Sequence, residues 1–360
     1  MLELAEIQKR LADYLGARVL SLKVLASGWE TTVFEFATGA ESPRFPELPA
    51  RTPMVLRFYQ GTFADAKGAR ENLTITKLSG VGFTVPRPYG YERDHGVLGA
   101  PFLIMERVAG GPLFSTRSFT GAFKTFSLGF FGFVRAQVRL HHMELRNSGL
   151  DAIPRAYTPD SVERAAPLLD RLLSVIEQRV EEGPLPGLRE AHARLASQAA
   201  QFRVAPLSLV HMDYHPQNVV VNGVRVTGVI DWVNTDIGDR HLDAAMTAAI
   251  LSSSAMEHPR WMRDNIAGNS LRALFTSLYI PLYHAMAPLD FERFRYCQAV
   301  ASLLRLSMLG MMRARGAEVV GFRPEAIGEV TPAVVRLLSR YAARHSGAAV
   351  GLDQAKPFPV

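Results

Sequence analysis

The feature that most limits the fold of this chain is a change in the pattern of apolar residues at Ala109-Gly110-Gly111-Pro112. Before this break, short β-type runs dominate, among them residues 19–25, 31–37 and 54–59. After it, most of the sequence has the apolar spacing that is typical of helices. Gly and Pro mark places where regular structure stops, so the break indicates two units. A chain of 360 residues is long enough for each unit to have its own core.

We therefore predict a bilobal α+β fold. Residues 1–106 would form a small β-rich N-terminal lobe, 107–112 a hinge, 113–344 a larger, mainly helical lobe, and 345–360 a loosely attached tail. The pattern predicts helices over 4–15, 64–78, 121–144, 159–182, 187–202, 241–253 and most of 269–344.

Composition excludes several classes of function. The net charge of +6 is spread along the chain, so we expect no nucleic-acid partner. No apolar run approaches the ~18 residues of a membrane span, and the N-terminus lacks the pattern of a secretory signal. The single cysteine, Cys297, cannot form an internal disulfide. We therefore expect a cytoplasmic protein that binds no membrane.

The residues that carry chemistry lie in 211–218 and 229–243, which follow a predicted strand at 207–211. Asp213 comes just after that strand, and Asn218 leads into a hairpin that turns at Asn222-Gly223. Asp231 ends this hairpin, so the fold can return it beside Asn218. One carboxylate and one amide oxygen can hold Mg²⁺, which also takes water and phosphate oxygens as ligands. Asp213 could then receive a proton from an attacking hydroxyl.

This order of motifs resembles the aminoglycoside phosphotransferase family of small-molecule kinases, also called choline-kinase-like. The matching motifs are His211-x-Asp213-x-x-x-x-Asn218, Ile230-Asp231-Trp232 and Gly238-Asp239-x-x-x-Asp243. The resemblance covers most of the chain and implies a protein-kinase-like fold that moves the γ-phosphate of ATP to a hydroxyl of a small molecule. It implies Asp213 as catalytic base, and Asn218 and Asp231 as ligands of Mg²⁺.

The same resemblance implies a nucleotide site in the N-terminal lobe. Arg57 stands on strand 54–59 where the kinase fold usually has Lys, and Glu71 would orient it; the planar guanidinium can reach two partners at once. Lys23 is a possible substitute cation. The loop at Ser27, Gly28 and Thr31 would cover the phosphates. Backbone groups of the hinge at Glu106 and Val108 would bind adenine.

Several neighbours of these motifs are expected to be structural. His211 and His215 would shape the catalytic loop, Asp243 would brace it, and His141 would pack against it. Asp239 would cap the helix that begins near Arg240, and Asp236 would be an exposed loop carboxylate.

A stripe of five phenylalanines lies on one face of a predicted helix and is typical of a core face. Its members are Phe119, Phe123, Phe126, Phe130 and Phe133. The alternatives are a lid or a homodimer contact.

The acceptor is not fixed by the sequence. A polycationic aminoglycoside needs an acidic cleft, which the net basic charge does not favour; an unknown metabolite or another antibiotic fits equally well. Candidates for the acceptor pocket are Glu257, His258, Trp261, Asp264, Tyr279, Tyr283, His284 and Asp290.

A protein kinase is disfavoured because Gly238 follows Asp231 too closely for a long activation segment. A catalytically impaired nucleotide-binding scaffold and an atypical protein kinase are the alternative functions.

Overall fold

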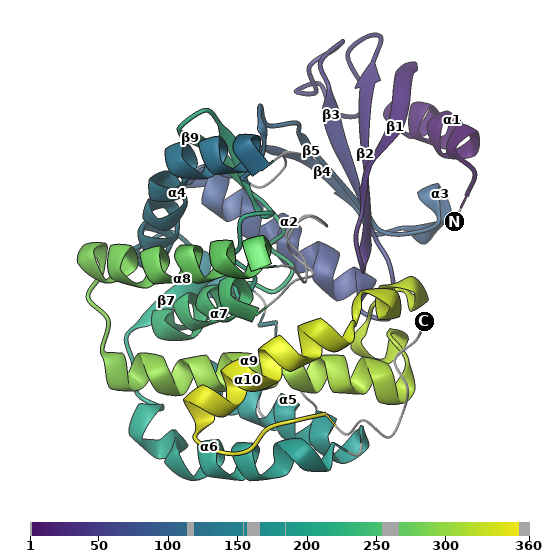
Figure 1. Cartoon of the computed structure of the whole chain (residues 1–360). Coiled ribbons are helices and arrows are strands. Elements are labelled where there is room, and N and C mark those ends of the chain that lie inside the picture. Colours follow the sequence, from purple (N-terminus) through teal and green to yellow (C-terminus); the bar gives the residue numbers. More distant parts are fainter. Residues whose placement is uncertain are drawn as a thin grey trace.

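A β-sheet forms the N-terminal part of the molecule and helices form most of the remainder (Figure 1). The computed structural model describes residues 2–113, 119–153, 155–156, 166–183, 185–253 and 266–352. Within these residues the architecture is α+β, as predicted, with the two parts in contact along one side of the sheet. None of the described helices combines the length and the apolar character that crossing a bilayer requires.

The N-terminal sheet is antiparallel and has the strand order β1-β2-β3-β5-β4. Its strands are β1 (Val19–Ser27), β2 (Thr31–Thr38), β3 (Met54–Tyr59), β4 (Pro88–Glu92) and β5 (Phe102–Glu106). Three helices accompany it: α1 (Leu4–Leu15), α2 (Ala64–Gly80) and the short α3 (His95–Leu98). Helix α1 ends at Gly16, whose φ of 63° is the left-handed conformation that commonly terminates helices.

Strand β3 is buried along its whole length because both faces of the sheet are covered at its centre. Met54, Leu56 and Phe58 point into the core beneath α1. Side chains alternate along a strand, so Val55, Arg57 and Tyr59 lie on the opposite face, toward α2 and the helical part. This alternation is what brings Arg57 to the boundary between the two parts.

The helical part contains seven long helices among the described residues. They are α4 (Phe119–His141), α5 (Leu168–Glu182), α6 (Arg189–Phe202), α7 (Arg240–Ser253), α8 (Ile266–Met286), α9 (Phe291–Arg315) and α10 (Pro332–Ser346). Five short strands accompany them: β6 (Gly111–Pro112), β7 (Leu207–Val210), β8 (Val219–Asn222), β9 (Arg225–Val229) and β10 (Asp236–Asp239). Strand β6 pairs with the β8–β9 hairpin, and β7 pairs with β10.

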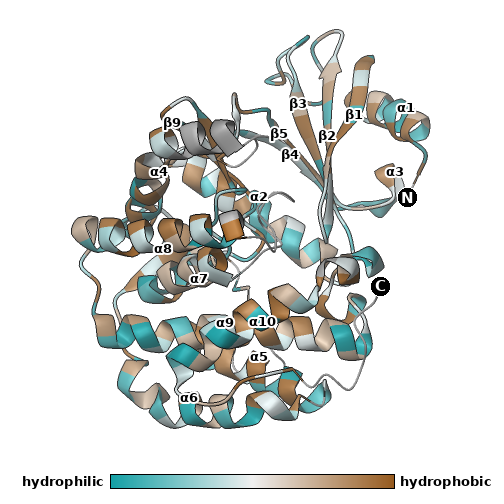
Figure 2. Cartoon of the chain, viewed as in Figure 1, coloured by the Kyte–Doolittle hydropathy of each residue, from teal (hydrophilic) through white to brown (hydrophobic). Residues whose placement is uncertain are grey.

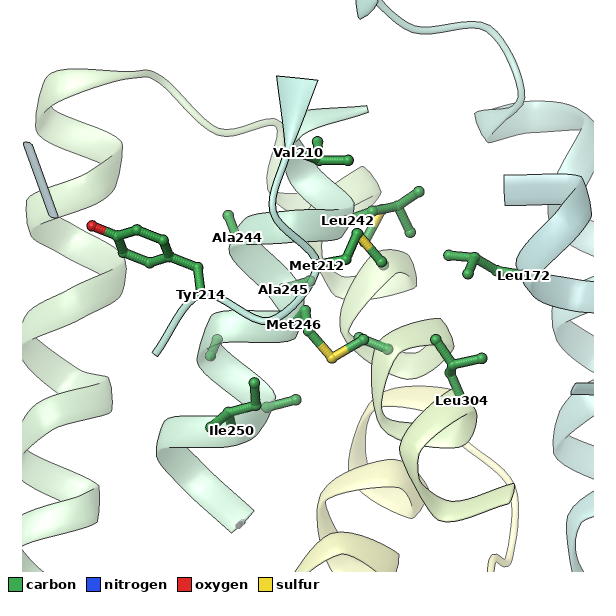
Figure 3. Close-up of a cluster of buried hydrophobic side chains, with 14 of the residues drawn as sticks. Leu172, Val210, Met212, Tyr214, Leu242, Ala244, Ala245, Met246, Ile250 and Leu304 are labelled. Carbon is green, nitrogen blue, oxygen red and sulfur yellow. The ribbon is translucent and has the colours of Figure 1, made fainter. Parts of the chain in front are cut away.

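Helix α7 is the centre of this part, since nearly all of its side chains are buried. Met246 and Ile250 pack near Met212, in the loop that follows β7, and Leu304 of α9 (Figure 3). Peripheral α6 instead buries one stripe, and Figure 2 shows a mixture of hydrophilic and hydrophobic residues along it. The loop that follows β7 therefore rests on a rigid apolar support.

The expected loose tail lies partly within the described residues. Helix α10 extends to Ser346, and Ala348 and Leu352 are buried in the core. The N–H of Gly351 also donates to the carbonyl of Gly187 at 3.3 Å. Residues 345–352 are thus held by apolar contacts and a backbone bond.

Candidate active site

The loop that follows β7 is held in an unusual backbone conformation by helix α7. Met212 has a φ of 61°, which is uncommon for a residue with a side chain. Its N–H donates to Oδ1 of Asp243 at 2.5 Å. The other oxygen of Asp243 contacts His141 Nε2 at 2.8 Å and accepts from Gln137 Nε2 at 3.0 Å. The prediction that Asp243 braces this loop is confirmed, and His141 reaches the loop through its contact with Asp243.

Asp213 lies at the centre of this loop with its carboxylate one quarter exposed. The side-chain amide of Asn218 donates to the Asp213 carbonyl at 2.9 Å and to its Oδ2 at 3.3 Å. His215 Nε2 lies 3.7 Å from Oδ2, and Arg305 of α9 lies 3.9 Å from Oδ1. Burial acts to raise the pKa of Asp213, but His215 and then Arg305 outweigh it and lower the pKa to about 2. Asp213 is therefore a carboxylate at neutral pH.

Asn218 and Asp231 are brought together by the start of the β8–β9 hairpin, where Ile230 N–H donates to the Asn218 carbonyl at 2.9 Å. The Asn218 amide nitrogen is used toward Asp213, and no described residue donates to its Oδ1. Asp231 has a φ of 68° and is partly exposed. In the described part of the chain, no three His, Cys, Asp or Glu side chains form a metal-binding group. An amide oxygen with one carboxylate fits Mg²⁺, which needs few protein ligands.

Arg57 links the sheet to this hairpin. Its Nε lies 3.0 Å from Glu71 Oε2, and its Nη2 donates to Asp231 Oδ1 at 2.6 Å. Glu71 is held from two further sides, by the Tyr59 hydroxyl at 2.7 Å and the Trp232 N–H at 3.1 Å. Burial would lower the pKa of Arg57, but Asp231 and Glu71 outweigh it and raise that pKa. The Arg57 guanidinium thus joins Glu71 of helix α2 to Asp231, which follows strand β9.

The loop between β1 and β2 is short and tightly held. Ser27 ends β1, Thr31 begins β2, and Gly28 N–H donates to the Thr31 carbonyl at 2.9 Å. Glu30 forms an ion pair with Lys67 of α2, and both side chains are mostly buried. Burial raises the pKa of Glu30, while Lys67 acts to lower it.

The predicted hinge leaves the Val108 N–H as a backbone donor. Glu106 N–H already donates to the Arg87 carbonyl at 2.8 Å. Among the described residues, none accepts from the N–H of Val108, whose side chain packs closely over Gly228 of β9. The Val108 N–H is thus available to an acceptor atom of a bound base.

The model of the phosphotransferase enzyme family matches residues 21–289. The chain belongs to the phosphotransferase enzyme family. As a member it is a kinase-type phosphotransferase that acts on hydroxyl groups, and the family resemblance predicted from the sequence is confirmed. No curated protein matches the chain.

Solved structures of related fold support the kinase-like architecture. A putative aminoglycoside phosphotransferase from Ralstonia eutropha JMP134 is 17% identical, with a TM-score of 0.64; the alignment covers 95% of this chain and 98% of that one. A thermostable mutant of aminoglycoside phosphotransferase APH(4)-Ia, in ternary complex with ADP and hygromycin B, is 16% identical with a TM-score of 0.58. That alignment covers 88% of this chain and 97% of the other. These similarities show the shared fold.

Two expectations about charged residues in this family member are wrong. Lys23 is no substitute for Arg57, because it is 65% exposed and pairs with Glu35 at 2.7 Å on the outer part of the sheet. Asp236 is not an exposed loop carboxylate. It is fully buried, and both of its oxygens accept from Arg171 of α5 at 2.8 Å, which satisfies the buried charge. The predicted cap is confirmed, since Asp239 accepts from His241 N–H at 2.9 Å at the start of α7.

The expected acceptor-pocket residues divide into two groups. Tyr279 and Tyr283 are fully buried, with hydroxyls bonded to Gln137 and His141, and Asp290 caps α9. His284 accepts from Leu289 N–H at 2.9 Å. The polar groups of these four residues form hydrogen bonds within the helical part. Binding of an acceptor molecule is therefore not needed to explain why these residues are polar. Glu257, His258, Trp261 and Asp264 lie outside the described residues.

The phenylalanine stripe is core-facing where its side chains are described. Phe130 and Phe133 are buried and stack with ring centroids 5.7 Å apart. The side chains of Phe119, Phe123 and Phe126 lie outside the described residues.

The sequence interpretation missed several residues that shape the site. Two could have been found from local spacing: Tyr59 shares a strand face with Arg57, and Lys67 precedes Glu71 by one helical turn. Arg305 has no such signal, because it reaches Asp213 from a helix 92 positions further along the chain.

Proposed function

We propose that this phosphotransferase uses ATP and moves its γ-phosphoryl group to a hydroxyl of a small molecule. The supporting observation is the convergence of Asp213, Asn218 and Asp231 with the Arg57–Glu71 pair at the boundary between sheet and helices. Phosphoryl transfer depends chiefly on positioning and on stabilising charge, and these groups supply both.

In the proposed reaction the acceptor oxygen forms a bond to the γ-phosphorus as the bond to the β–γ bridging oxygen breaks and ADP leaves. Asp213 orients the acceptor hydroxyl and takes its proton. Arg57 contacts the α- and β-phosphates while Glu71 holds its orientation. Asn218 and Asp231 would hold Mg²⁺, which when bound neutralises charge on the phosphates. The β1–β2 loop at Ser27, Gly28 and Thr31 covers the phosphates, with Glu106 and Val108 beside adenine.

The charges around Asp213 favour an acceptor that is neutral or anionic. Arg305 lies 3.9 Å from one carboxylate oxygen, and its side chain is only 11% exposed. A cation fixed this close to the reacting hydroxyl would repel a polycationic acceptor. We therefore propose a hydroxyl-bearing metabolite or uncharged antibiotic before an aminoglycoside.

The experiment that tests this function is a screen of hydroxyl-bearing compounds for acceptor-dependent formation of ADP. With a compound that serves as acceptor, Asp213→Ala should lower turnover by roughly 10²–10⁴-fold while ADP binding persists. Asp151→Ala changes an exposed carboxylate in the same half of the molecule and serves as the matched control. Full turnover by Asp213→Ala would exclude Asp213 as the base.

A further inference from the structure

The β1–β2 loop contacts a segment from the far end of the chain. Arg323 lies between α9 and α10, and its N–H donates to the Trp29 carbonyl at 2.7 Å. Its guanidinium also donates to the Gly28 carbonyl. Next to it, the ring of Phe322 meets the Trp29 ring edge-on, with centroids 5.0 Å apart. We call these four residues the loop latch.

The latch fixes the direction of two successive peptide groups. In a trans peptide, the C=O and the following N–H point to opposite sides. Because the carbonyls of Gly28 and Trp29 both face Arg323, the N–H groups of Trp29 and Glu30 face away from it. Among the described residues neither N–H has a hydrogen-bond partner. Two adjacent free N–H groups form the kind of concavity that binds phosphate oxygens.

The neighbouring helix α2 completes the support of this loop. Lys67 pairs with Glu30, and its ammonium lies 5.4 Å from the centre of the Phe322 ring. This pair neutralises a carboxylate that would otherwise repel phosphate. The chains also pass very closely, since a Cβ on Gly61 would lie 2.7 Å from the carbonyl oxygen of Gly321. Strands, helix α2 and the segment after α9 therefore meet at one point, near the lower ends of β1 and β2 (Figure 1).

We propose that Arg323 and Phe322 are positioning residues, which hold the β1–β2 loop so that the N–H groups of Trp29 and Glu30 face the nucleotide phosphates. Residues 27–32 contain a single glycine, Gly28, and the contacts from Arg323 add to the bond within the loop between the Gly28 N–H and the Thr31 carbonyl. The latch also ties the loop to the helical part, so nucleotide release requires the latch to open. This inference rests on the proposed use of ATP.

Release of a fluorescent ADP analogue, followed after mixing with excess unlabelled ADP and Mg²⁺, tests the latch. Arg323→Ala removes the bond to Gly28, and Phe322→Leu removes the ring contact without touching a backbone acceptor. Arg323→Ala should accelerate release by roughly tenfold, since hydrogen bonds from charged donors have about this effect. Phe322→Leu should also accelerate release, by up to about tenfold, because an aromatic pair contributes about 0.5–1.5 kcal/mol. Arg323→Lys retains a donor and should keep part of the slow release. Arg315→Ala, an exposed residue at the end of α9, is the matched control and should release ADP at the wild-type rate.

The outcomes separate the latch from the function on which it rests. If the wild-type protein binds no ADP, the proposed function fails and the inference falls with it. If wild type binds ADP but Arg323→Ala and Phe322→Leu release it at the wild-type rate or more slowly, the latch does not position the loop. A loss of thermal stability in the nucleotide-free variants, without faster release, would show a merely structural contact and would also overturn the proposal.

Discussion

At the scale of single residues, the protonation state of Asp213 limits what this side chain can do. A carboxyl group with a pKa of about 2 is a weak base, so in the proposed reaction it would accept a proton only late, when the acceptor oxygen is already bonding to phosphorus. Its larger proposed contribution is to orient the acceptor hydroxyl. His215 and Arg305, which lower this pKa, therefore also limit how readily Asp213 accepts a proton.

The lowered pKa of Asp213 also predicts a pH dependence of stability. A group whose pKa is lower in the folded state than its ordinary 3.8 stabilises the protein above that value, and the contribution is lost as the pH falls toward 2. Asp213→Asn, which resembles the protonated form, should lower the unfolding free energy by about 2 kcal/mol at pH 7. Urea unfolding at pH 7 and at pH 3 should show this difference shrinking, whereas Asp151→Asn should show little difference at pH 7. A gap that widens in acid would contradict the assignment.

Asp231 carries the prediction for the metal. In the proposed site Asp231 lies beside Asn218, so Asp231→Ala should remove one of the two side chains proposed to hold Mg²⁺. We expect the thermal shift caused by ATP to become independent of Mg²⁺ in this variant. The control is Asp170→Ala, which removes a carboxylate that pairs with Arg203 on the surface. If Mg²⁺ changed the ATP-induced thermal shift of Asp231→Ala as much as that of the wild type, Asp231 would not be a ligand of Mg²⁺.

At the scale of elements, strand β3 and helix α2 form one unit through Glu71. The Tyr59 hydroxyl donates to Glu71 at 2.7 Å in a buried environment. Tyr59→Phe leaves that carboxylate without one donor, and we expect a loss of about 1–3 kcal/mol in unfolding free energy together with weaker ADP binding. Tyr89→Phe, on strand β4 of the same sheet, provides the control for aromatic substitution. Unchanged ADP affinity in Tyr59→Phe would show that Glu71 is oriented without it.

Helix α5 and strand β10 are joined by a buried ion pair. Both oxygens of Asp236 accept from Arg171, and neither side chain is exposed. Arg171→Met leaves the carboxylate buried without its main partner, which should cost about 3–5 kcal/mol by urea unfolding. Arg189→Met, whose ion pair is exposed, should change stability by less than about 1 kcal/mol. Recovery in Arg171→Met combined with Asp236→Leu would confirm that the unpaired charge is the cause; a persistent loss would point to packing.

The elements were largely predictable from the sequence because local patterns specify them. Helix α1 has the predicted bounds of 4–15, β3 those of 54–59, and the β8–β9 hairpin turns at Gly223, whose φ is 62°. The proximity of Asn218 and Asp231 was also predictable, because these residues adjoin the paired ends of strands β8 and β9. The partners of the site residues were not predictable, since Arg171, Arg305 and Arg323 reach their carboxylate or carbonyl across long separations in sequence. Contacts of this kind leave no periodic pattern in the sequence from which they could be predicted.

At the scale of the whole molecule, Arg57 connects the two parts. Its fork reaches Glu71 of the sheet side and Asp231 of the helical side at once. Arg57→Lys keeps the charge but has a single ammonium, so it can hold only one partner well. We expect weaker ADP binding and an unfolding free energy lowered by about 1–3 kcal/mol, measured by calorimetry and urea unfolding. Arg18→Lys, exposed beside β1, is the control; wild-type values in Arg57→Lys would show that the fork is not needed.

Arginine at this position also changes how the protein can be probed. A guanidinium stays protonated and is no nucleophile, so electrophilic nucleotide analogues that acylate amines find no reactive group on β3. The chain has only six lysines, and of these Lys67 lies next to the loop that would cover the phosphates. Such analogues should therefore leave β3 unmodified and mark α2 instead, a labelling pattern that distinguishes this enzyme in a mixture of lysine-bearing kinases.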